Sequence, residues 1–529
     1  MNSNIYIIYN AVIYMIFQDK INVYYENMKN NKLYILIYFI IAFVSVLFSG
    51  LCINGHYKFT AVIIIFSIIL GFFCLIYYFN HKDELYKVAF VTIISFGVIC
   101  AFITPIFISP DEVEHFMRSL LTSQGNLFPH YVQIPTNDSV SNISGFSIDS
   151  TKGFYDLFIN LNQIFFNANV LNIPINNAHA YFYTAFLHNP FYGYLAQGFG
   201  ILLANILHLN NIWMLWLGRI CNLILYAVLI SIAVKKTPIL KVPMLFMALL
   251  PLAIYQGSSM SIDATVNGLG FIVVAYFLFL FKSKEKSISS KELIIFSILV
   301  LLLSYTKLTY LVFILLLLCI PKNKFKIPYY YIAIPILLVS TLALIWSSQT
   351  TPIYDFSRQG YYAINNINSS QQINFMIHHP TDSIISLLYI IPNVFEMLYN
   401  TFTFYNGIEL FSSDLLLGLG LISFIFVVFF YNIKENIPLK YKLLVLLVLI
   451  INFFGTYIIQ LFKWTPVGQL YPILGVQSRY FIPLFGLLVF VFNFNRDFNI
   501  DETKIDNLVM IVSISLLISL ISTMLFKFY

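Results

Sequence analysis

The residue types best suited to catalysis are concentrated in one short stretch that directly follows the apolar segment 87–108. The stretch reads Ser109-Pro110-Asp111-Glu112-Val113-Glu114-His115-Phe116-Met117-Arg118. Ser109 as N-cap and Pro110 in the first turn predict a helix, and acidic residues in that turn interact favourably with the helix dipole. Three- and four-residue spacings then place on one helix face the side chains of Asp111, Glu114, His115 and Arg118.

Such a cluster at a membrane boundary favours a chemical role. Carboxylates beside apolar surface are desolvated, which raises their pKa toward the range that general acids and bases use. The alternative is an ordinary helix start with a solvated acidic turn and an intrahelical ion pair. We expect Asp111 to be a general base, with Glu112 as the second candidate and His115 in a supporting role.

Two further segments place polar residues beside apolar runs. His188-Asn189-Pro190-Phe191-Tyr192 opens the apolar segment 189–208, and Ser258-Ser259-Met260-Ser261-Ile262-Asp263 separates two others. An acidic residue this close to hydrocarbon is energetically costly, so Asp263 is a candidate catalytic residue and His188 a candidate substrate ligand. In the simpler interpretation, Asn189 and Ser261 only cap helices.

Arginine is rare in this sequence, and one arginine follows a polar motif. Arg479 comes after Gly475-Val476-Gln477-Ser478, on a side of the membrane where positive charge is disfavoured. A guanidinium can hold a phosphate group with two hydrogen bonds, so we expect Arg479, with Lys307 or Arg118, to bind phosphate. The candidate substrate-binding residues are Arg118, His188, Arg219, Lys307, Gln477, Arg479 and Tyr480.

The composition identifies the class of protein. Of the 529 residues, 59% are hydrophobic and only 10% are charged, against roughly 25% charged residues in soluble domains. These values exclude a soluble enzyme, a disordered scaffold and a disulfide-rich secreted domain. Membrane-spanning helices need about 20 apolar residues each, and the apolar runs here reach that length, unlike the strands of a β-barrel. The five cysteines show no metal-binding spacing, and nothing indicates nucleic acid as a partner.

The distribution of basic residues predicts an all-α polytopic membrane protein with about thirteen transmembrane helices. The continuous spans are expected at 33–53, 59–79, 87–108, 212–233, 242–257, 261–281, 328–347, 411–431, 443–462, 479–494 and 507–527. Residues 292–320 form a longer run that is interrupted at Lys307, which predicts a hairpin of two short helices. Residues 189–208 are predicted to lie in the outer interface. Arg219, inside a span, is expected to pair with a loop carboxylate or carbonyl, with a role in the substrate site as the alternative.

This topology puts the N-terminus inside and the C-terminus outside. It divides the chain into a cytoplasmic segment 1–32, two extra N-terminal spans at 33–86, a main membrane domain at 87–494, and a loop with the last span at 495–529. Met28, followed by Lys29, is a candidate for the true start. Long outer loops are expected at 109–211 and 348–410, and such loops commonly carry function. No nucleotide-binding motif accompanies them.

The order of these motifs resembles an uncharacterised bacterial membrane family, the domain of unknown function 2142. The resemblance spans roughly residues 87–494 and rests on Pro110-Asp111-Glu112-x-x-His115, His188-x-Pro190, Arg219, Ser259-x-Ser261-x-Asp263 and Gly475-x-Gln477-x-Arg479-Tyr480. That family is similar in layout to the GT-C glycosyltransferases, in which an acidic pair follows a transmembrane helix and the first outer loop carries interfacial helices. Asp111 and Glu112 match the pair, and residues 189–208 match the second interfacial helix. The two extra N-terminal spans depart from this layout.

The resemblance implies a glycosyltransferase of the bacterial cytoplasmic membrane. It would move a sugar from a polyprenyl-phosphate donor to a surface glycan or lipid acceptor at the outer face. One carboxylate would deprotonate the acceptor hydroxyl, and cations would stabilise the departing phosphate. A divalent metal, Mg²⁺ or Mn²⁺, held by Asp111 is compatible with this chemistry but not required by it. The alternative functions are a transporter or flippase of lipid-linked glycans, and a membrane scaffold that leaves the acidic and basic motifs unexplained.

Overall fold

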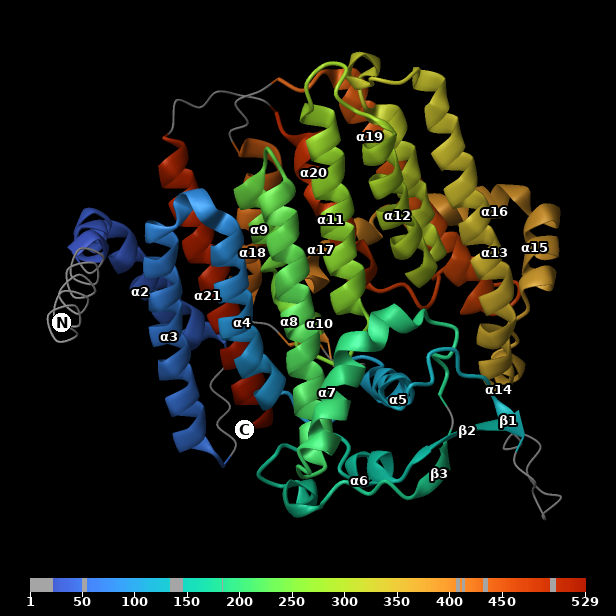
Figure 1. The fold of residues 1–529 in the computed structure, drawn as a ribbon, viewed down its shortest axis with the longest axis horizontal. Helices are drawn as coiled ribbons and strands as arrows, with labels where there is room; N and C mark the ends of the chain where they lie inside the picture. The colour runs from blue at the N-terminus through green and yellow to red at the C-terminus, as the bar shows by residue number, and fades with distance from the viewer. Residues whose placement is uncertain are drawn as a thin grey trace, which may run out of the picture.

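The protein is an almost entirely helical bundle. The computed structural model describes residues 22–49, 55–133, 146–182, 184–405, 410–411, 414–431, 436–494 and 501–529. Figure 1 shows long helices side by side, with a layer of short helices and strands covering one end of the bundle. The all-α architecture predicted from the composition is therefore confirmed.

The elements follow one another in four groups. The N-terminal group is Asn22–Asn30, α2 (Lys32–Phe48), α3 (Tyr57–Asn80), η1 (Lys82–Glu84) and α4 (Leu85–Ile103). The end layer is α5 (Glu112–Ser123), β1 (Val132–Gln133), β2 (Phe146–Thr151), α6 (Gly153–Ile159), η2 (Asn169–Asn172), β3 (His179–Phe182), η3 (Phe191–Tyr194) and α7 (Leu195–Ile206). Strands β1, β2 and β3 form one small antiparallel sheet.

The remaining elements build the rest of the bundle. The central group is α8 (Ile212–Lys236), α9 (Lys241–Ala248), α10 (Pro251–Gly257), α11 (Asp263–Lys282), α12 (Ser290–Thr306), η4 (Leu308–Cys319), η5 (Lys322–Lys324), η6 (Tyr329–Ile332) and α13 (Ala333–Ser357). The last group is α14 (Gln359–Ile364), α15 (Ser369–His378), α16 (Pro380–Tyr389), α17 (Asn393–Asn400), β4 (Phe404–Tyr405), β5 (Leu410–Phe411), α18 (Asp414–Ile425), η7 (Phe426–Phe430), α19 (Leu439–Lys463), η8 (Ser478–Leu484), α20 (Phe485–Phe492) and α21 (Glu502–Phe528).

Several helices are long enough to cross a membrane. Among the described residues, eight helices have the length and composition of a span, or up to nine if the bent pair Asn22–Asn30 and Lys32–Phe48 is one span. Three further apolar helices, Leu308–Cys319, Leu417–Phe430 and Ser478–Phe492, are shorter. The prediction of about thirteen spans included such short segments, so that count stays a prediction.

Two of the predicted spans have different boundaries in the structure. The predicted span 242–257 is wrong as one helix, because Pro251 has no backbone N–H to continue α9 and instead begins α10. The predicted span 328–347 is too short, since α13 continues through Pro352 to Ser357. The predicted outer loop 348–410 is correspondingly helical in α14 to α17.

Helices α11 and α21 form the interior of the bundle. In each of them, 94% of the most apolar 18-residue stretch is buried inside the protein. Helix α8 packs against α4, α7 and α11, and α21 packs against α2, α3 and α4. The two extra N-terminal helices therefore cover one side of α21.

The basic connections, namely the lysine-rich segment between α11 and α12 and the lysine-rich segment after η4, lie together at the end opposite to the α5–α7 layer (Figure 1). The connection between α11 and α12 is joined to the segment after η4, because Lys286 N–H donates to the Asn323 carbonyl (2.9 Å) and Lys326 N–H to the Ile288 carbonyl (2.8 Å). At the other end, α5 and α7 lie beside the first residues of α11. The basic connections and the α5–α7 layer therefore lie at opposite ends of the bundle.

Cysteine labelling tests which end is cytoplasmic. In a cysteine-free background, we expect Lys284→Cys, in the exposed α11–α12 connection, to react with an impermeant maleimide only after permeabilisation. Lys152→Cys, exposed in the opposite layer, should react in intact cells. Reaction of Lys284→Cys in intact cells, with protection of Lys152→Cys, would show that the orientation is inverted.

Candidate functional site

Asp111 lies in a tight turn between α4 and α5. Its backbone is left-handed, with φ at 58°, a conformation that aspartate tolerates better than most residues. The prediction that Ser109 caps this helix is wrong, because α5 begins at Glu112 without a side-chain cap and the Glu112 N–H donates to the Ser109 carbonyl (3.1 Å). The turn directs the neighbouring carboxylates of Asp111 and Glu112 to different partners.

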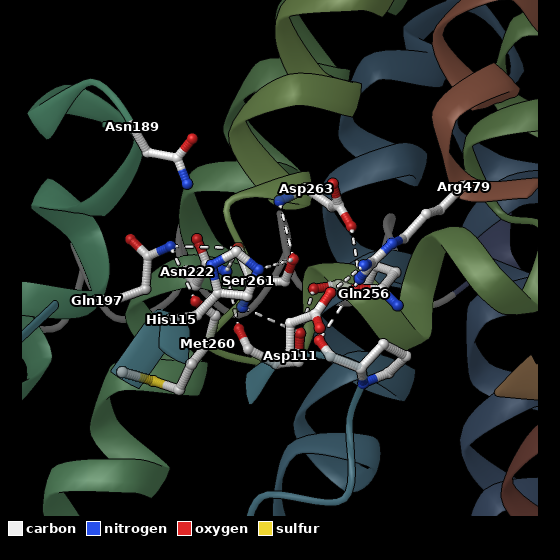
Figure 2. A network of polar contacts seen from close by, with 12 residues as sticks. Asp111, His115, Asn189, Gln197, Asn222, Gln256, Met260, Ser261, Asp263 and Arg479 are labelled. Carbon is white, nitrogen blue, oxygen red and sulfur yellow. Dashed lines mark hydrogen bonds and ion pairs between the residues drawn. The ribbon is translucent and has the colours of Figure 1, made fainter. Parts of the chain in front are cut away.

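Arg479 joins two acidic residues from distant parts of the sequence. Its Nη2 donates to Asp111 Oδ2, and its Nη1 lies 3.2 Å from Asp263 Oδ2. Nη1 also lies 3.5 Å from the Pro110 carbonyl oxygen. Figure 2 shows both carboxylates pointing toward the guanidinium. The start of α5, the start of α11 and η8 therefore meet at one cation.

These charges keep Asp111 ionised. Desolvation by the surrounding protein is the largest single influence and raises the pKa of the Asp111 carboxyl. The charge and hydrogen bond of Arg479, together with other nearby positive charges, outweigh it, so the pKa lies below its ordinary value. The Arg479 side chain is 5% exposed, whereas the Asp111 side chain keeps 43% of its surface accessible. The site thus presents an accessible, ionised carboxylate beside a buried cation.

Two histidines nearby, the buried His115 and the half-buried His188, are neutral. Burial lowers the pKa of His115 to about 4 and that of His188 to about 3. His115 Nδ1 is bonded to Tyr194 Oη (2.9 Å), and its Nε2 lies 3.4 Å from Ser261 Oγ. Ser261 Oγ in turn accepts the Asp263 N–H (3.1 Å), but the N-cap of α11 is Ile262, so the prediction that Ser261 caps this helix is wrong. His115 therefore supports the start of α11.

Lys307 separates α12 from η4, and the predicted break in the run 292–320 is confirmed. Its backbone is extended, the two helices pack against each other, and Nζ lies over the ring of Tyr480. Nζ is buried and has no hydrogen-bond partner within the described part of the chain. Burying an ammonium group without a partner is costly, so this position suits an anionic ligand.

A cavity of about 320 Å³ collects most of the predicted site residues. Those that line it are Asp111, His115, His188, Asp263, Lys307, Gln477, Arg479 and Tyr480. Helices α12, α13 and α19 supply the opposite walls. The motifs at 109–118, 188–192, 258–263 and 475–480 therefore converge in space, as their polar residues suggested.

The sequence analysis did not single out Arg358 and Tyr354, which also line this cavity. The Arg358 guanidinium lies 4.4 Å from the centre of the Trp464 ring and 5.0 Å from that of Tyr354. Lys463, on another wall, pairs with Asp355 at 2.6 Å. The scarcity of arginine was a usable signal, because Arg358 lies in a predicted outer segment where basic residues are disfavoured.

Glu112 and Arg219 do not line the cavity. Their side chains are completely buried and form an ion pair, with 2.6 Å between Arg219 Nη2 and Glu112 Oε2. Arg219 also donates to the carbonyls of Ala101, Thr104 and Pro105. The expected pairing of Arg219 with a carboxylate and carbonyls is confirmed. The predictions of Glu112 as a base and of Arg219 as a substrate ligand are wrong, because the charge of each residue is already compensated inside the protein.

Arg118 is also held away from the cavity. Its guanidinium donates to Thr122 Oγ1 (2.8 Å) and to the Leu127 carbonyl (2.9 Å), and lies 5.3 Å from the Tyr194 ring centre. Glu114 accepts hydrogen bonds from Thr184 and from the Ala185 N–H. The side chains predicted to share one face of α5 therefore contact different parts of the protein. Arg118 is a structural residue, so its prediction as a substrate ligand is wrong.

The acidic residues of the cavity fit a metal ion poorly. The described ranges contain no group of three or more His, Cys, Asp or Glu side chains arranged to hold one. Asp111 and Asp263 are the two carboxylates of the cavity, and an oxygen of each already faces Arg479.

Fold and site together define a helical, polytopic membrane protein with a polar cavity at one end, lined by four basic side chains and two carboxylates. The chain belongs to the DUF2142 family of predicted membrane proteins, whose model matches residues 94–488. The match includes every cavity residue from Asp111 to Arg479 and excludes α2, α3 and α21. Neither a curated protein nor a solved structure matches the chain.

The buried pair gives a stability prediction. Arg219→Met leaves the Glu112 carboxylate buried without its partner, which we expect to lower the free energy of unfolding by about 3–5 kcal/mol. Replacing both partners, in Glu112→Leu with Arg219→Met, should be less destabilising than the single change. Thermal unfolding of the purified variants in detergent measures both effects.

Lys87→Met is the matched control for this prediction. Lys87 pairs with Glu84 at 2.7 Å, but both side chains are about two-fifths exposed (42% and 40%), so its loss should change the melting temperature little. Equal melting temperatures for Arg219→Met and Lys87→Met would contradict a structural role for the buried pair.

Proposed function

We propose that this protein is a membrane glycosyltransferase that moves a sugar from a polyprenyl-phosphate donor to a hydroxyl of a surface glycan or lipid. The observation that carries the proposal is the placement of Asp111, an accessible carboxylate, in one cavity with the buried basic groups of Arg479 and Lys307. A lipid-linked sugar is already activated, because phosphate is its leaving group. Transfer then needs a base for the acceptor and positive charge for the phosphate.

An apolar groove beside the cavity suits the lipid of such a donor. The groove has a volume of about 440 Å³ and lies between α12 and α13, with Ile298 and Leu338 among its exposed apolar residues. One turn further along the same helices, Ser304 and Trp346 line the polar cavity. An isoprenoid chain in the groove would bring its phosphate to the end of α12, where Lys307 lies.

The proposed reaction uses the residues of the cavity directly. Asp111 accepts the proton of the acceptor hydroxyl while the hydroxyl oxygen bonds to the anomeric carbon of the sugar. The bond from that carbon to the phosphate oxygen breaks, and polyprenyl phosphate leaves with the electron pair. Arg479 and Lys307 stabilise the phosphate, and in this proposal they take the place of a divalent metal.

The other predicted residues have supporting places in this proposal. Asp263 pairs with the second terminal nitrogen of the Arg479 guanidinium. His115 supports the segment that begins α11. Tyr480 packs against Lys307, and Gln477 lies on the same wall as Arg479. Asp263 and His115 are therefore positioning residues, while Asp111 contacts the reacting atoms.

The detailed topology belongs to the same proposal. With α16 and α17 outside the membrane, the segments α9 with α10, α12, η4, α18 with η7, and η8 with α20 would complete about thirteen spans in a GT-C-like layout. The basic end would face the cytoplasm, and the cavity would open at the outer face of the bacterial cytoplasmic membrane. The clustering of the basic connections away from the cavity supports this orientation.

Asp111→Asn tests the base. The amide keeps the size of the side chain but cannot accept the proton, so transfer should fall by about 10²–10⁴-fold while the protein still inserts and folds. The assay measures sugar transfer from membrane lipid extract to surface glycan at equal expression. Asp83→Asn, an exposed carboxylate at the opposite end, is the control and should be silent. Wild-type transfer by Asp111→Asn would contradict the proposal.

The pH dependence of kcat/KM gives an independent test. The base must be ionised, and the pKa of Asp111 in the free protein lies below the ordinary value of about 3.9. His115, with its pKa lowered to about 4, also stays neutral above that range. We expect kcat/KM to stay constant from neutral pH down to about pH 5 and to fall only at lower pH. A loss of activity centred between pH 6 and 7 would identify a different titrating group.

A further inference from the structure

A second cavity adjoins the first on the other side of Arg479. It has a volume of about 230 Å³ and lies between α10, α17 and the segment 476–479. Arg479 and Gln477 line both cavities, and Pro110, whose carbonyl faces Arg479, lines the second while Asp111 lines the first. The two cavities therefore meet at Arg479 and Gln477, next to the proposed base.

Three amide side chains of the second cavity have atoms without partners. Gln256 is completely buried, and neither its Oε1 nor its Nε2 forms a hydrogen bond within the described residues. Asn400 Oδ1 and Gln477 Oε1 are also buried and unpaired there. Figure 2 shows Gln256 beside Arg479. Buried polar groups are nearly always paired in proteins, so three such amides around one cavity indicate a ligand that pairs with them.

The chemistry of these groups indicates a neutral, hydroxyl-rich ligand. An amide offers both donors and acceptors, as a hydroxyl does, whereas a phosphate ligand needs donors and a cation needs acceptors. Glu396 also lines this cavity, and its carboxylate disfavours an anionic ligand there. Leu252 and Met397 supply apolar surface for the C–H face of a sugar ring.

We propose that the second cavity binds a neutral sugar unit of the acceptor, with Gln256, Asn400 and Gln477 bonded to its hydroxyl groups. The inference rests on the proposed function, because it assigns the acceptor to the side of Arg479 away from the α12–α13 groove. The volume holds several water molecules at about 30 Å³ each, which suits one monosaccharide unit and not an oligosaccharide. An acceptor hydroxyl at the shared wall would then face Asp111.

Ligand-observed NMR on the full-length protein in nanodiscs tests this assignment. The probes are neutral methyl glycosides of glucose, galactose, mannose and N-acetylglucosamine. We expect saturable binding of at least one glycoside to the wild type, and about fivefold to tenfold weaker binding for Gln256→Leu and for Asn400→Leu, because each loses one or two hydrogen bonds. Added polyprenyl phosphate should not displace the glycoside, because it occupies the first cavity.

Asn267→Leu is the matched control. Asn267 is a completely buried amide on α11 with both polar atoms unpaired in the described structure, and it lines neither cavity. This variant should bind the glycoside as the wild type does, and its melting temperature shows the general effect of replacing a buried amide by leucine. Weaker binding confined to the cavity variants supports the assignment.

Several outcomes would overturn the inference. They are the absence of glycoside binding to the wild type, unchanged binding by Gln256→Leu, an equal loss in Asn267→Leu, and displacement of the glycoside by polyprenyl phosphate. The proposed function fails separately, if the wild type does not bind polyprenyl phosphate. Glycoside binding that depends on Gln256 would still establish the second cavity as a sugar site in that case.

Discussion

The arrangement of the whole site depends on the buried ion pair between Glu112 and Arg219. Glu112 Oε1 accepts hydrogen bonds from Arg219 Nε (2.8 Å) and from the Met260 N–H (3.0 Å). One carboxylate thus ties α8 to the start of α5 and to the segment that precedes α11. Its sequence neighbour is Asp111, and Met260 lies three residues before Asp263. Both acidic residues of the cavity are therefore positioned by a pair that does not enter it.

Helix α8 reinforces the same segment with neutral side chains. Asn222 Nδ2 donates to the carbonyls of Ser259 and Ser261 (2.8 Å each), and Gln197 on α7 reaches the carbonyls of Met260 and Ser261. A buried ion pair is weak evidence of stability, because desolvation of its two charges offsets most of their attraction. The main effect of this ion pair is to fix the position of the backbone segments that it joins. It holds irregular backbone in place where neither helix nor sheet satisfies the peptide groups.

The sequence predicted which motifs carry polar chemistry, and the structure brings most of them together. It predicted the break at Lys307 because a lysine interrupts an apolar run. It did not separate Asp111 from Glu112, because two adjacent acidic residues look equivalent until a left-handed turn sends them to different partners. Arg118 was assigned to the wrong place for a related reason, since helical spacing puts it on the face of His115 while its hydrogen bonds hold it against Thr122 and Leu127. The second cavity had no sequence signal, because unpaired amides look ordinary until their surroundings are known.

In the proposed function, the position of Arg479 between two carboxylates would link donor binding to the activation of the base. In the free protein Arg479 compensates Asp111 and lowers its pKa, which makes Asp111 ionised but weakly basic. A donor phosphate near Lys307 would attract the same guanidinium, since Arg479 lines that cavity as well. As Arg479 turns from carboxylate to phosphate, the desolvation of Asp111 is no longer offset, and its affinity for a proton rises. The carboxylate would thus become an effective base only when the sugar to be transferred is in place.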